Sequence, residues 1–309
     1  MTGSRSAGPR VSIGVPVHNG EPYLEDTLRS LLEQDEPGFE ILISDNASSD
    51  GTQALCRRLA ESDARITYSR SPVNRGAAWN YNRVLEMASA PYFKWAAADD
   101  LCQPAFVRRC VEAIEASDAR AVLAYPQTIL IDDTGTEIGP MDDSNLDLRD
   151  ARPASRLRRL LRNRFEWHPI FGVIRTDTLR QTSGIGSFPL ADTVTLAELC
   201  LRGAFVQVPA PLFLRRYHDK RSLVAGPSFL EQLAWYDPHR RAKAVFPQAR
   251  VSRELLAAAA RAPLPPAERL TCAAVVLREW TLPHWRHIGG EVKLALRNAV
   301  PRDRAVPAE

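Results

Sequence analysis

The first third of the chain alternates short β-rich segments with segments of helical periodicity. Apolar residues such as Leu24, Leu28 and Leu31 recur at the three- and four-residue spacing of one helix face. The sequence predicts strands at Val11–Val17, Glu40–Ser44, Ile66–Ser69 and Tyr92–Ala96. Strands that alternate with helices form a largely parallel sheet covered by helices. We therefore expect an α/β fold built on an open, mostly parallel, twisted sheet with helices on its faces.

The periodicity changes after about residue 120. Thr128–Ile131 and Thr136–Ile138 flank the turn signal Asp132–Gly135, which predicts a hairpin. Helices are expected at Arg152–Phe165 and Thr193–Leu201, and a strand at Leu212–Tyr217. From Ser228 onward the pattern is helical, with a break at Pro263–Pro266. The prediction is a Rossmann-like half over residues 1–130, a second half over 131–225, and a C-terminal helical appendage over 226–309.

Composition excludes several classes of protein. The chain has 309 residues and a net charge of +3, too small to indicate nucleic acid as a partner. Five scattered cysteines without a Cys-x-x-Cys suggest neither a disulfide framework nor a zinc site. The polar N-terminus has no signal-peptide pattern, and apolar runs fall short of the ~20 residues that span a bilayer. We expect a cytoplasmic protein.

Polar residues follow each of the four predicted strands. In an open α/β sheet, ligands bind beyond the carboxyl ends of the strands. The residues at these positions are Asn19, Asp45-Asn46, Asn74-Arg75 and Asp99-Asp100. Their regular placement predicts one ligand site that accepts a nucleotide.

The acid pair Asp99-Asp100 follows the run Tyr92–Ala98, which is apolar apart from Lys94, and therefore emerges from a buried strand. Two adjacent carboxylates repel each other, and a divalent cation relieves that repulsion. Mg²⁺ or Mn²⁺ is commonly held by one or two carboxylates plus substrate phosphates. The alternative is a cap for the helix that begins near Gln103. The pairs Asp132-Asp133 and Asp142-Asp143 lie in a predicted turn and a polar loop, where solvation is the simpler interpretation.

Four motifs match a known family in order and spacing. They are Val11–Asn19, Asp45–Thr52, Asn74-Arg75-Gly76 and Ala98-Asp99-Asp100. Together they resemble the family 2 glycosyltransferases of GT-A fold, closely over about the first 130 residues and more loosely to Tyr217. The resemblance implies a UDP-, dTDP- or GDP-sugar donor, a Mn²⁺ or Mg²⁺ ion, and inversion at the anomeric carbon. It also implies a nucleotide-sugar half followed by an acceptor-binding and catalytic half.

The resemblance also implies roles for individual residues. Asp100 is implied as the principal metal ligand, and Asp99 and His218 are implied as further metal ligands. Asp192 stands where the family often has a Glu-Asp pair that supplies the general base. Nucleotide contacts are implied for Pro16, Val17, Asn19, Asp45, Asn46, Arg75 and Asp99. Closure over the donor diphosphate is implied for Arg215 and Arg216.

Three positions depart from the family pattern. His18 replaces a frequent aromatic residue, Asn46 replaces a frequent second Asp, and Ala191 replaces the Glu of the Glu-Asp pair. Asp192 has an alternative interpretation as the cap of the helix that follows it.

Some aromatic residues have two interpretations. His168 and Trp167 are acceptor-site candidates, although a structural turn explains His168 equally well and Trp167 is expected to pack in the core. In the C-terminal region, Trp280 and Trp285 are expected to pack rather than catalyse.

The segment Arg152–Arg164 contains six arginines and no acid. One interpretation is an amphipathic helix with a solvated basic face. The other is peripheral contact with anionic lipid or with a lipid-linked acceptor at the inner face of a membrane. The acceptor itself, whether a saccharide, a lipid-linked molecule or a small molecule, is not identified.

Two other functions compete with sugar transfer. A sugar nucleotidyltransferase requires a glycine-rich, basic loop after the first strand, whereas this chain has His18-Asn19-Gly20-Glu21. A non-catalytic nucleotide-binding protein is expected to have lost its acid pair, which is intact here. No G-x-G-x-x-G follows a strand, which argues against a dinucleotide oxidoreductase.

Overall fold

The computed structural model describes residues 8–117, 120–141, 144–162, 168–218, 229–238 and 246–299. The description of the fold and of the site concerns these residues. The predicted loop acids Asp142 and Asp143 and the acceptor candidate Trp167 lie outside them, as does Arg164.

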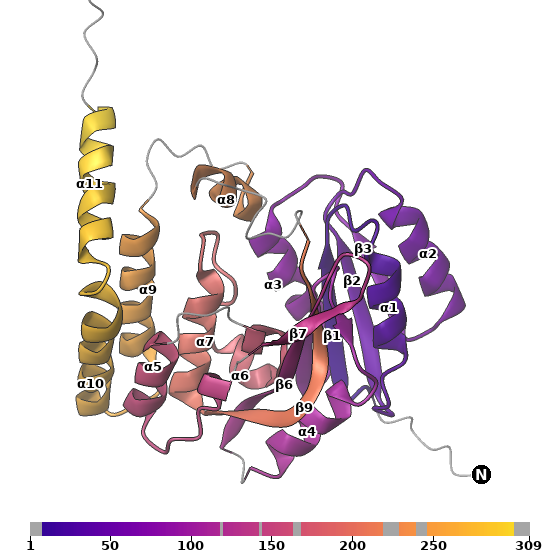
Figure 1. Ribbon diagram of the computed structural model, residues 1–309, viewed down its shortest axis with the longest axis horizontal. Coiled ribbons are helices and arrows are strands. Elements are labelled where there is room, and N and C mark those ends of the chain that lie inside the picture. Colours follow the sequence, from indigo (N-terminus) through magenta and orange to yellow (C-terminus); the bar gives the residue numbers. More distant parts are fainter. Residues whose placement is uncertain are drawn as a thin grey trace, which may run out of the picture.

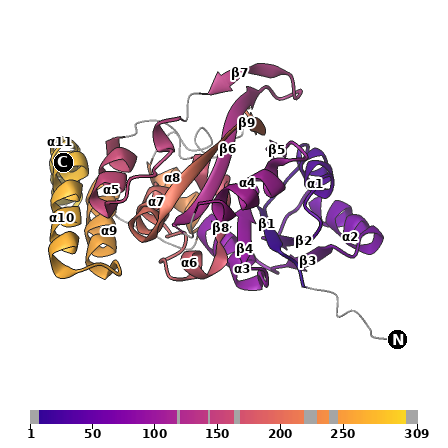
Figure 2. The ribbon, with the colours of Figure 1, turned by 90° about the horizontal axis from the view of Figure 1, so that it is seen from below.

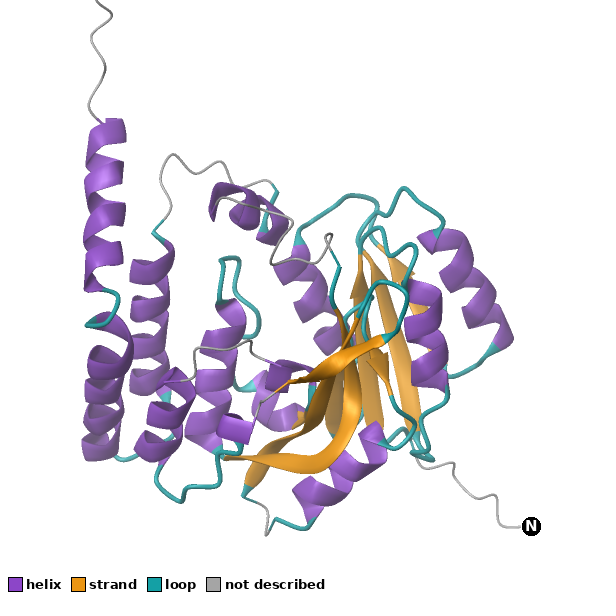
Figure 3. Ribbon diagram, viewed as in Figure 1, coloured by secondary structure: helices purple, strands orange, loops and turns teal. Residues whose placement is uncertain are grey.

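The N-terminal half is a parallel sheet with helices on both faces (Figures 1 and 3). Its strands run in the order β3-β2-β1-β4 and all adjacent pairs are parallel. The strands are β1 (Val11–Val17), β2 (Phe39–Asp45), β3 (Ile66–Arg70) and β4 (Tyr92–Trp95). The helices are α1 (Leu24–Leu32), α2 (Thr52–Ser62), α3 (Ala77–Met87) and α4 (Phe106–Glu115). The predicted α/β class and all four predicted strands are confirmed, with boundaries that differ by no more than one residue.

The two faces of this sheet belong to different cores. Ile13 and Val15 are fully buried on the face covered by α1 and α4, and Phe93 and Trp95 on the opposite face. Gly14 lies where α3 crosses β1, and a Cβ there would be 2.7 Å from Val84. A larger residue at this position would push α3 away from the sheet.

The second half continues the same sheet with mixed strands (Figure 2). β8 (Val173–Arg175) is antiparallel to both β4 and β6 (Ala121–Ile131), and β9 (Ala204–Arg216) is parallel to β6. Register shifts along the β6–β9 pair mark bulges, which increase the bend and twist of strands. The short strand β5 (Leu101–Cys102) pairs with the far end of β9.

The predicted hairpin is confirmed, because β6 pairs antiparallel with β7 (Glu137–Met141) around the Asp132 turn. The sequence did not predict β8 or the first part of β9. β8 is short and β9 pairs irregularly with β6, and the partner strands of both lie far along the chain. Local periodicity therefore gives little indication of either strand.

Most of the remaining helices gather at the end of the molecule away from α1 and α2, but one of them, α8, lies beside α3 (Figure 1). α5, α7, α9 and α10 pack against one another there. The helices that follow α4 in the described part of the chain are α5 (Pro153–Arg162), α6 (Thr176–Arg180), α7 (Ala191–Arg202), α8 (Phe229–Tyr236), α9 (Pro247–Arg261), α10 (Pro266–Val276) and α11 (Trp285–Ala299). Short helical turns are η1 (Ser144–Leu146), η2 (His168–Phe171) and η3 (Leu277–Thr281). The predicted break at Pro263–Pro266 is the turn between α9 and α10. Trp280 is buried as expected, whereas Trp285 is 62% exposed.

The arginines of α5 bind mainly to other parts of the protein. Arg156 is buried and donates to the Cys200 carbonyl at 2.7 Å. Arg162 forms an ion pair with Glu279 at 2.9 Å, and Arg159 pairs with Asp150 at 3.1 Å. These contacts join α5 to its neighbours and reduce the charge that it presents to solvent. Among the described residues, no helix is both long and apolar enough to cross a membrane.

Candidate active site

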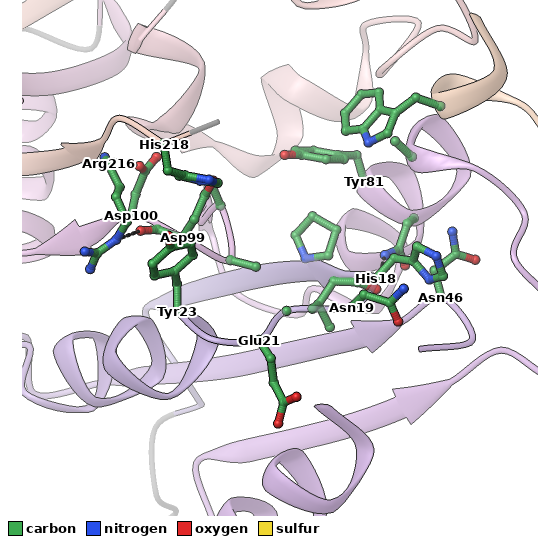
Figure 4. A pocket seen from close by; sticks show the side chains of 18 of the residues that line it. His18, Asn19, Glu21, Tyr23, Asn46, Tyr81, Asp99, Asp100, Arg216 and His218 are labelled. Atoms are coloured by element: carbon green, nitrogen blue, oxygen red, sulfur yellow. Dashed lines mark hydrogen bonds and ion pairs between the residues drawn. The ribbon is translucent and has the colours of Figure 1, made fainter. Parts of the chain in front are cut away.

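A pocket of about 290 Å³ lies beyond the carboxyl ends of β1, β2 and β4 (Figure 4). The start of α3, the end of β9 and α8 complete its wall. Predicted site residues that line it are Pro16, Val17, Asn19, Asn46, Asp99, Asp100, Arg215, Arg216 and His218. Asp45, Arg75, His168 and Asp192 are not among the described residues that line it. The strand-end residues therefore come together as the sequence predicts, but not all of them face the same space.

The turn after β1 is held in place by the loop after β2. Asn19 adopts a left-handed backbone conformation with φ of 54°, which asparagine tolerates better than most residues. Its Oδ1 accepts a hydrogen bond from the Ser49 amide at 2.8 Å, and its own amide donates to Ser48 Oγ at 2.9 Å. The Gly20 amide donates to Thr52 Oγ1 at 2.9 Å. These bonds fix the pocket wall before any ligand arrives.

Asp45 lies behind this wall. Its side chain is fully buried, and Oδ2 accepts from the Tyr68 hydroxyl at 2.7 Å and from Arg70 Nε at 3.2 Å. Oδ1 accepts from the Ser48 amide at 2.8 Å. These contacts give Asp45 a role in shaping the loop. Its contact with a nucleobase stays a prediction.

Asn46, Asn74 and His18 form a polar edge on the other side of the pocket from the acid pair (Figure 4). Asn46 Nδ2 donates to Asn74 Oδ1 at 2.9 Å and to the Gly76 carbonyl at 3.2 Å. Asn46 Oδ1 accepts from the Arg75 amide at 2.9 Å, and Asn74 Nδ2 lies 3.2 Å from His18 Nε2. We call these three side chains the amide edge.

The Arg75 side chain is exposed and leaves the pocket. Its guanidinium lies 5.0 Å from the centre of the Trp79 ring, in a cation–π contact. The predicted contact with the nucleotide therefore requires the side chain to move. It stays a prediction.

Asp99 and Asp100 follow β4 and differ in environment. Asp100 is buried, and its Oδ1 accepts from the Arg216 amide at 2.9 Å. Burial and the neighbouring Asp99 charge raise the pKa of Asp100 above its usual range. Asp99 Oδ2 lies 2.9 Å from His218 Nε2, and the His218 ring packs 4.7 Å from Tyr23. Burial therefore makes the ionised form of Asp100 costly unless a positive charge lies beside it.

Successive arginines at the end of β9 have different surroundings. Arg216 is buried and donates from Nε to the Asp99 carbonyl at 3.0 Å. Its Nη1 donates to the carbonyls of Asp132 and Asp133 at 3.1 and 3.0 Å. Arg216 therefore ties the acid-pair loop to the β6–β7 turn. Closure over the donor stays a prediction for both arginines.

Arg215 lines the pocket and contacts the ring of His168 through Nη1. His168 itself is buried on η2, and the centre of its ring lies 6.3 Å from the centre of the Phe213 ring. This position suits a residue that orients Arg215. Direct contact of His168 with an acceptor stays a prediction.

Asp192 lies in the first turn of α7, after Leu190, which has a left-handed φ of 66°. Its Oδ1 accepts from the Thr193 amide at 2.8 Å. Burial raises the pKa of Asp192 to about 6, and the charge of Arg215 partly offsets this. The carboxylate also contributes to the raised pKa of Tyr81, whose main cause is burial. Because Tyr81 lines the pocket, Asp192 lies near the pocket without forming its wall.

Several residues that line the pocket were not predicted from the sequence. Ala77, Asn80 and Tyr81 occupy one face of α3 at the spacing i, i+3 and i+4. That periodicity was available in the sequence once the loop after β3 was placed at the site. The others are Tyr23 and Phe171, with Ala234 and Trp235 of α8. They reach the site through tertiary contacts that no local pattern reveals.

The acid pair fits a divalent cation. Two adjacent carboxylates, one of them buried, offer oxygen ligands and an excess of negative charge. In the described part of the chain, no group of three or more His, Cys, Asp or Glu side chains is arranged to hold a metal. A cation at this site would therefore need ligands from a bound phosphate or from water.

Residues 12–184 match the family model described as glycosyl transferase family 2. The chain belongs to this family. A relative within it, named "Putative teichuronic acid biosynthesis glycosyltransferase TuaG" of Bacillus subtilis, is 37% identical over 92 residues. This alignment covers 30% of the chain and 36% of that relative's length.

Solved structures of glycosyltransferases share the fold of this family 2 chain. Staphylococcus aureus TarS 1–349, in complex with UDP-GlcNAc, superposes with a TM-score of 0.65 at 14% identity, covering 94% of this chain and 82% of that one. The mannosyltransferase PcManGT of Pyrobaculum calidifontis, in complex with GDP-Man and Mn²⁺, gives 0.51 at 19% identity and covers 96% and 77%. The predicted GT-A fold is confirmed.

Proposed function

We propose that this chain is a glycosyltransferase that moves a sugar from a nucleoside diphosphate to an acceptor hydroxyl, with inversion. The observation that carries the proposal is the meeting of Asp99-Asp100, Arg215 and the amide edge in one pocket. Such a pocket offers separate positions for a nucleobase, a diphosphate and a cation. Family membership and the nucleotide sugars named for the two structural neighbours support the same assignment.

The nucleobase is assigned to the amide edge. Asn46 Oδ1 accepts only the Arg75 amide among the contacts described, so a second lone pair is available to a ligand. An accepting oxygen suits the N3–H of uracil or thymine. The donor proposed here is therefore a UDP- or dTDP-sugar, with Pro16, Val17 and Asn19 lining the nucleotide's path.

The diphosphate is assigned to the opposite side of the pocket, beside Asp99 and Asp100. A Mn²⁺ or Mg²⁺ ion held by these carboxylates would act as a Lewis acid toward the departing diphosphate. Arg215 adds a fixed positive charge on the same wall. Arg216 keeps Asp99 in place through its carbonyl, and His218 orients the Asp99 carboxylate.

Asp192 is assigned as the general base. The acceptor hydroxyl must lose its proton as its oxygen bonds to the anomeric carbon and the bond to the diphosphate breaks. A positioned carboxylate typically contributes ~10²–10⁴-fold to such a step. Burial raises the pKa of Asp192 to about 6, which makes it a stronger base than an exposed aspartate while it remains mostly ionised at neutral pH.

A panel of nucleotide sugars, tested for hydrolysis with and without Mn²⁺, would examine this proposal directly. Metal-dependent release of UDP or dTDP from one sugar donor is the expected result. Release of pyrophosphate from a nucleoside triphosphate and a sugar phosphate would instead identify a nucleotidyltransferase. Binding of nucleotide with no turnover of any donor, with a range of saccharide and lipid acceptors, would indicate a non-catalytic protein.

A further inference from the structure

The outer face of α10, η3 and the start of α11 carries exposed apolar side chains. Leu270, Leu277, Leu282 and Trp285 are between 45% and 73% exposed. We call these four residues the C-terminal stripe. Large apolar side chains that gather on one exposed face usually mark a surface that binds something.

Leu270 and Leu277 follow helical periodicity on the side of α10 opposite the core. Leu270 and Leu277 are seven residues apart, with the exposed Ala274 between them. Cys272 and Val276, on the inner side of the same helix, are fully buried. α10 thus has apolar residues on both sides, although only one side packs against α5 and α9. The helix bundle does not need the outer leucines for its own core.

Exposed charges beside the stripe are basic. Arg269, Arg278, Arg286 and Lys293 are all exposed. The Arg286 guanidinium lies 5.4 Å from the centre of the Trp285 ring. The stripe is therefore flanked by cations along its described length.

The acids of this segment turn inward instead. The Glu279 side chain is only 10% exposed and pairs with Arg162 of α5 at 2.9 Å, with Arg278 3.7 Å away. Glu291 accepts from the amides of Gln248 and Ala249 at the start of α9, at 2.9 and 3.2 Å. Glu268 is half-buried. Negative charge is used within the bundle, and positive charge is left at its surface.

We propose that the C-terminal stripe lies on an anionic membrane surface. Leucines and a tryptophan bordered by arginine and lysine form the pattern of a helix that rests in the lipid headgroup region. Each cation near an anionic bilayer surface adds to the attraction. A second copy of the chain fits this face less well, because its approach would bring like charges together.

This surface is separate from the pocket and from the basic residues of α5. The helices α10 and α11 that carry it lie at the edge of the molecule farthest from α1 and α2 (Figures 1 and 2). The basic helix α5 was the membrane-contact candidate predicted from the sequence. It is a weaker candidate than the stripe, because Arg156, Arg159 and Arg162 bind partners within the protein. Membrane contact at the stripe does not depend on the proposed reaction.

Co-sedimentation of the full chain with lipid vesicles tests the proposal, without donor or acceptor present. Vesicles of phosphatidylglycerol and phosphatidylcholine should retain at least about ten times more protein than vesicles of phosphatidylcholine alone. The double variant Leu282→Glu, Trp285→Glu should lower the binding to anionic vesicles by at least about tenfold. Ile138→Glu, at a residue 58% exposed on β7, is the matched control and should bind as wild type does.

Three outcomes would contradict the proposal that the stripe binds an anionic membrane. Equal binding to the two kinds of vesicle, or full binding by the double variant, would overturn the proposal. So would concentration-dependent dimerisation of the wild type, measured by sedimentation equilibrium, that the double variant abolishes. Because both substituted side chains are exposed, circular dichroism and melting temperature should be unchanged and thereby exclude misfolding as the cause.

Discussion

Asp99 and His218 are in direct contact, with 2.9 Å between Asp99 Oδ2 and His218 Nε2. One residue follows β4 and the other follows β9, 119 positions later in the chain. The ring of Tyr23, from the turn before α1, packs on His218 at 4.7 Å. Three loops are thus joined beside the acid pair.

The first prediction concerns His218. Replacing it with alanine frees the Asp99 carboxylate to rotate, so a cation loses one oriented ligand. We expect the Mn²⁺ concentration for half-maximal donor turnover to rise roughly tenfold or more. His287→Ala, an exposed histidine of α11, is the control and should leave this value unchanged. The same Mn²⁺ dependence in both variants would show that His218 has no part in metal binding.

The second prediction concerns the metal itself. Exhaustive chelation should abolish transfer, and added Mn²⁺ or Mg²⁺ should restore it. Asp100→Asn keeps an oxygen for the Arg216 amide but removes the charge, so it should lower turnover by at least about 100-fold with the fold retained. Circular dichroism and turnover measured on the same preparation would check this. Full activity after chelation would reject a metal requirement.

The third prediction concerns the nucleotide. In the presence of metal, UDP or dTDP should raise the melting temperature more than ADP does, because the Asn46 oxygen accepts an imide N–H. Asn46→Ala should reduce this preference, whereas Val73→Ala, at a residue 52% exposed in the loop beside the amide edge, should preserve it. Equal stabilisation by all the diphosphates in the wild type would contradict the assignment of the amide edge to the base.

The fourth prediction concerns Asp192. Asparagine keeps the hydrogen bond from the Thr193 amide but cannot take a proton, so Asp192→Asn should lose at least about 100-fold in transfer. Donor binding should be unchanged. In the wild type, transfer should rise with pH through about 6 as the base ionises. Transfer by the variant at a near wild-type rate would place the base elsewhere.

Stability gives an independent check on the same residue. Burial raises the pKa of Asp192 to about 6, so the folded protein holds a proton that an unfolded chain, with a pKa of about 3.9, has already released. Stability is therefore lost as pH rises from about 4 to about 6. Asp192→Asn should be at least as stable as wild type above pH 6, and the difference should shrink toward pH 4. Melting temperatures of both proteins across this range would show it.

The fifth prediction separates the adjacent arginines of β9. Arg216→Lys cannot reproduce the donors that reach three carbonyls, and it should cost about 1–3 kcal/mol of stability. Arg215→Lys should change stability less and reduce turnover more, because both arginines line the pocket but the Arg216 guanidinium is engaged by the carbonyls of Asp99, Asp132 and Asp133. Denaturant melts and donor turnover of both variants would check the contrast. The reverse pattern would exchange the two roles.

The sequence by itself determined the parallel half of the fold and the edge at which the site lies. β1 and β4 are recognisable because a strand buried on both faces is rich in apolar residues on both faces, and a turn or loop follows it. Asn19 and Asp99-Asp100 sit directly after such runs. Parallel strands end at one edge of the sheet, so local order along the chain was enough to place these side chains together.

Only the tertiary structure decided how each of those side chains is used. Asp45 and Asn46 are neighbours in sequence, yet Asp45 binds Tyr68 and Arg70 behind the wall while Asn46 faces the pocket. Arg215 and Arg216 both line the pocket, yet Arg216 donates to the carbonyls of Asp99, Asp132 and Asp133 while Arg215 contacts His168. Residues adjacent in an extended segment point in opposite directions, and which direction meets the pocket depends on strand register. The register of β9 is set by its pairing with β6, a strand about 80 residues earlier in the chain, and bulges interrupt this pairing. No local sequence pattern encodes such a register.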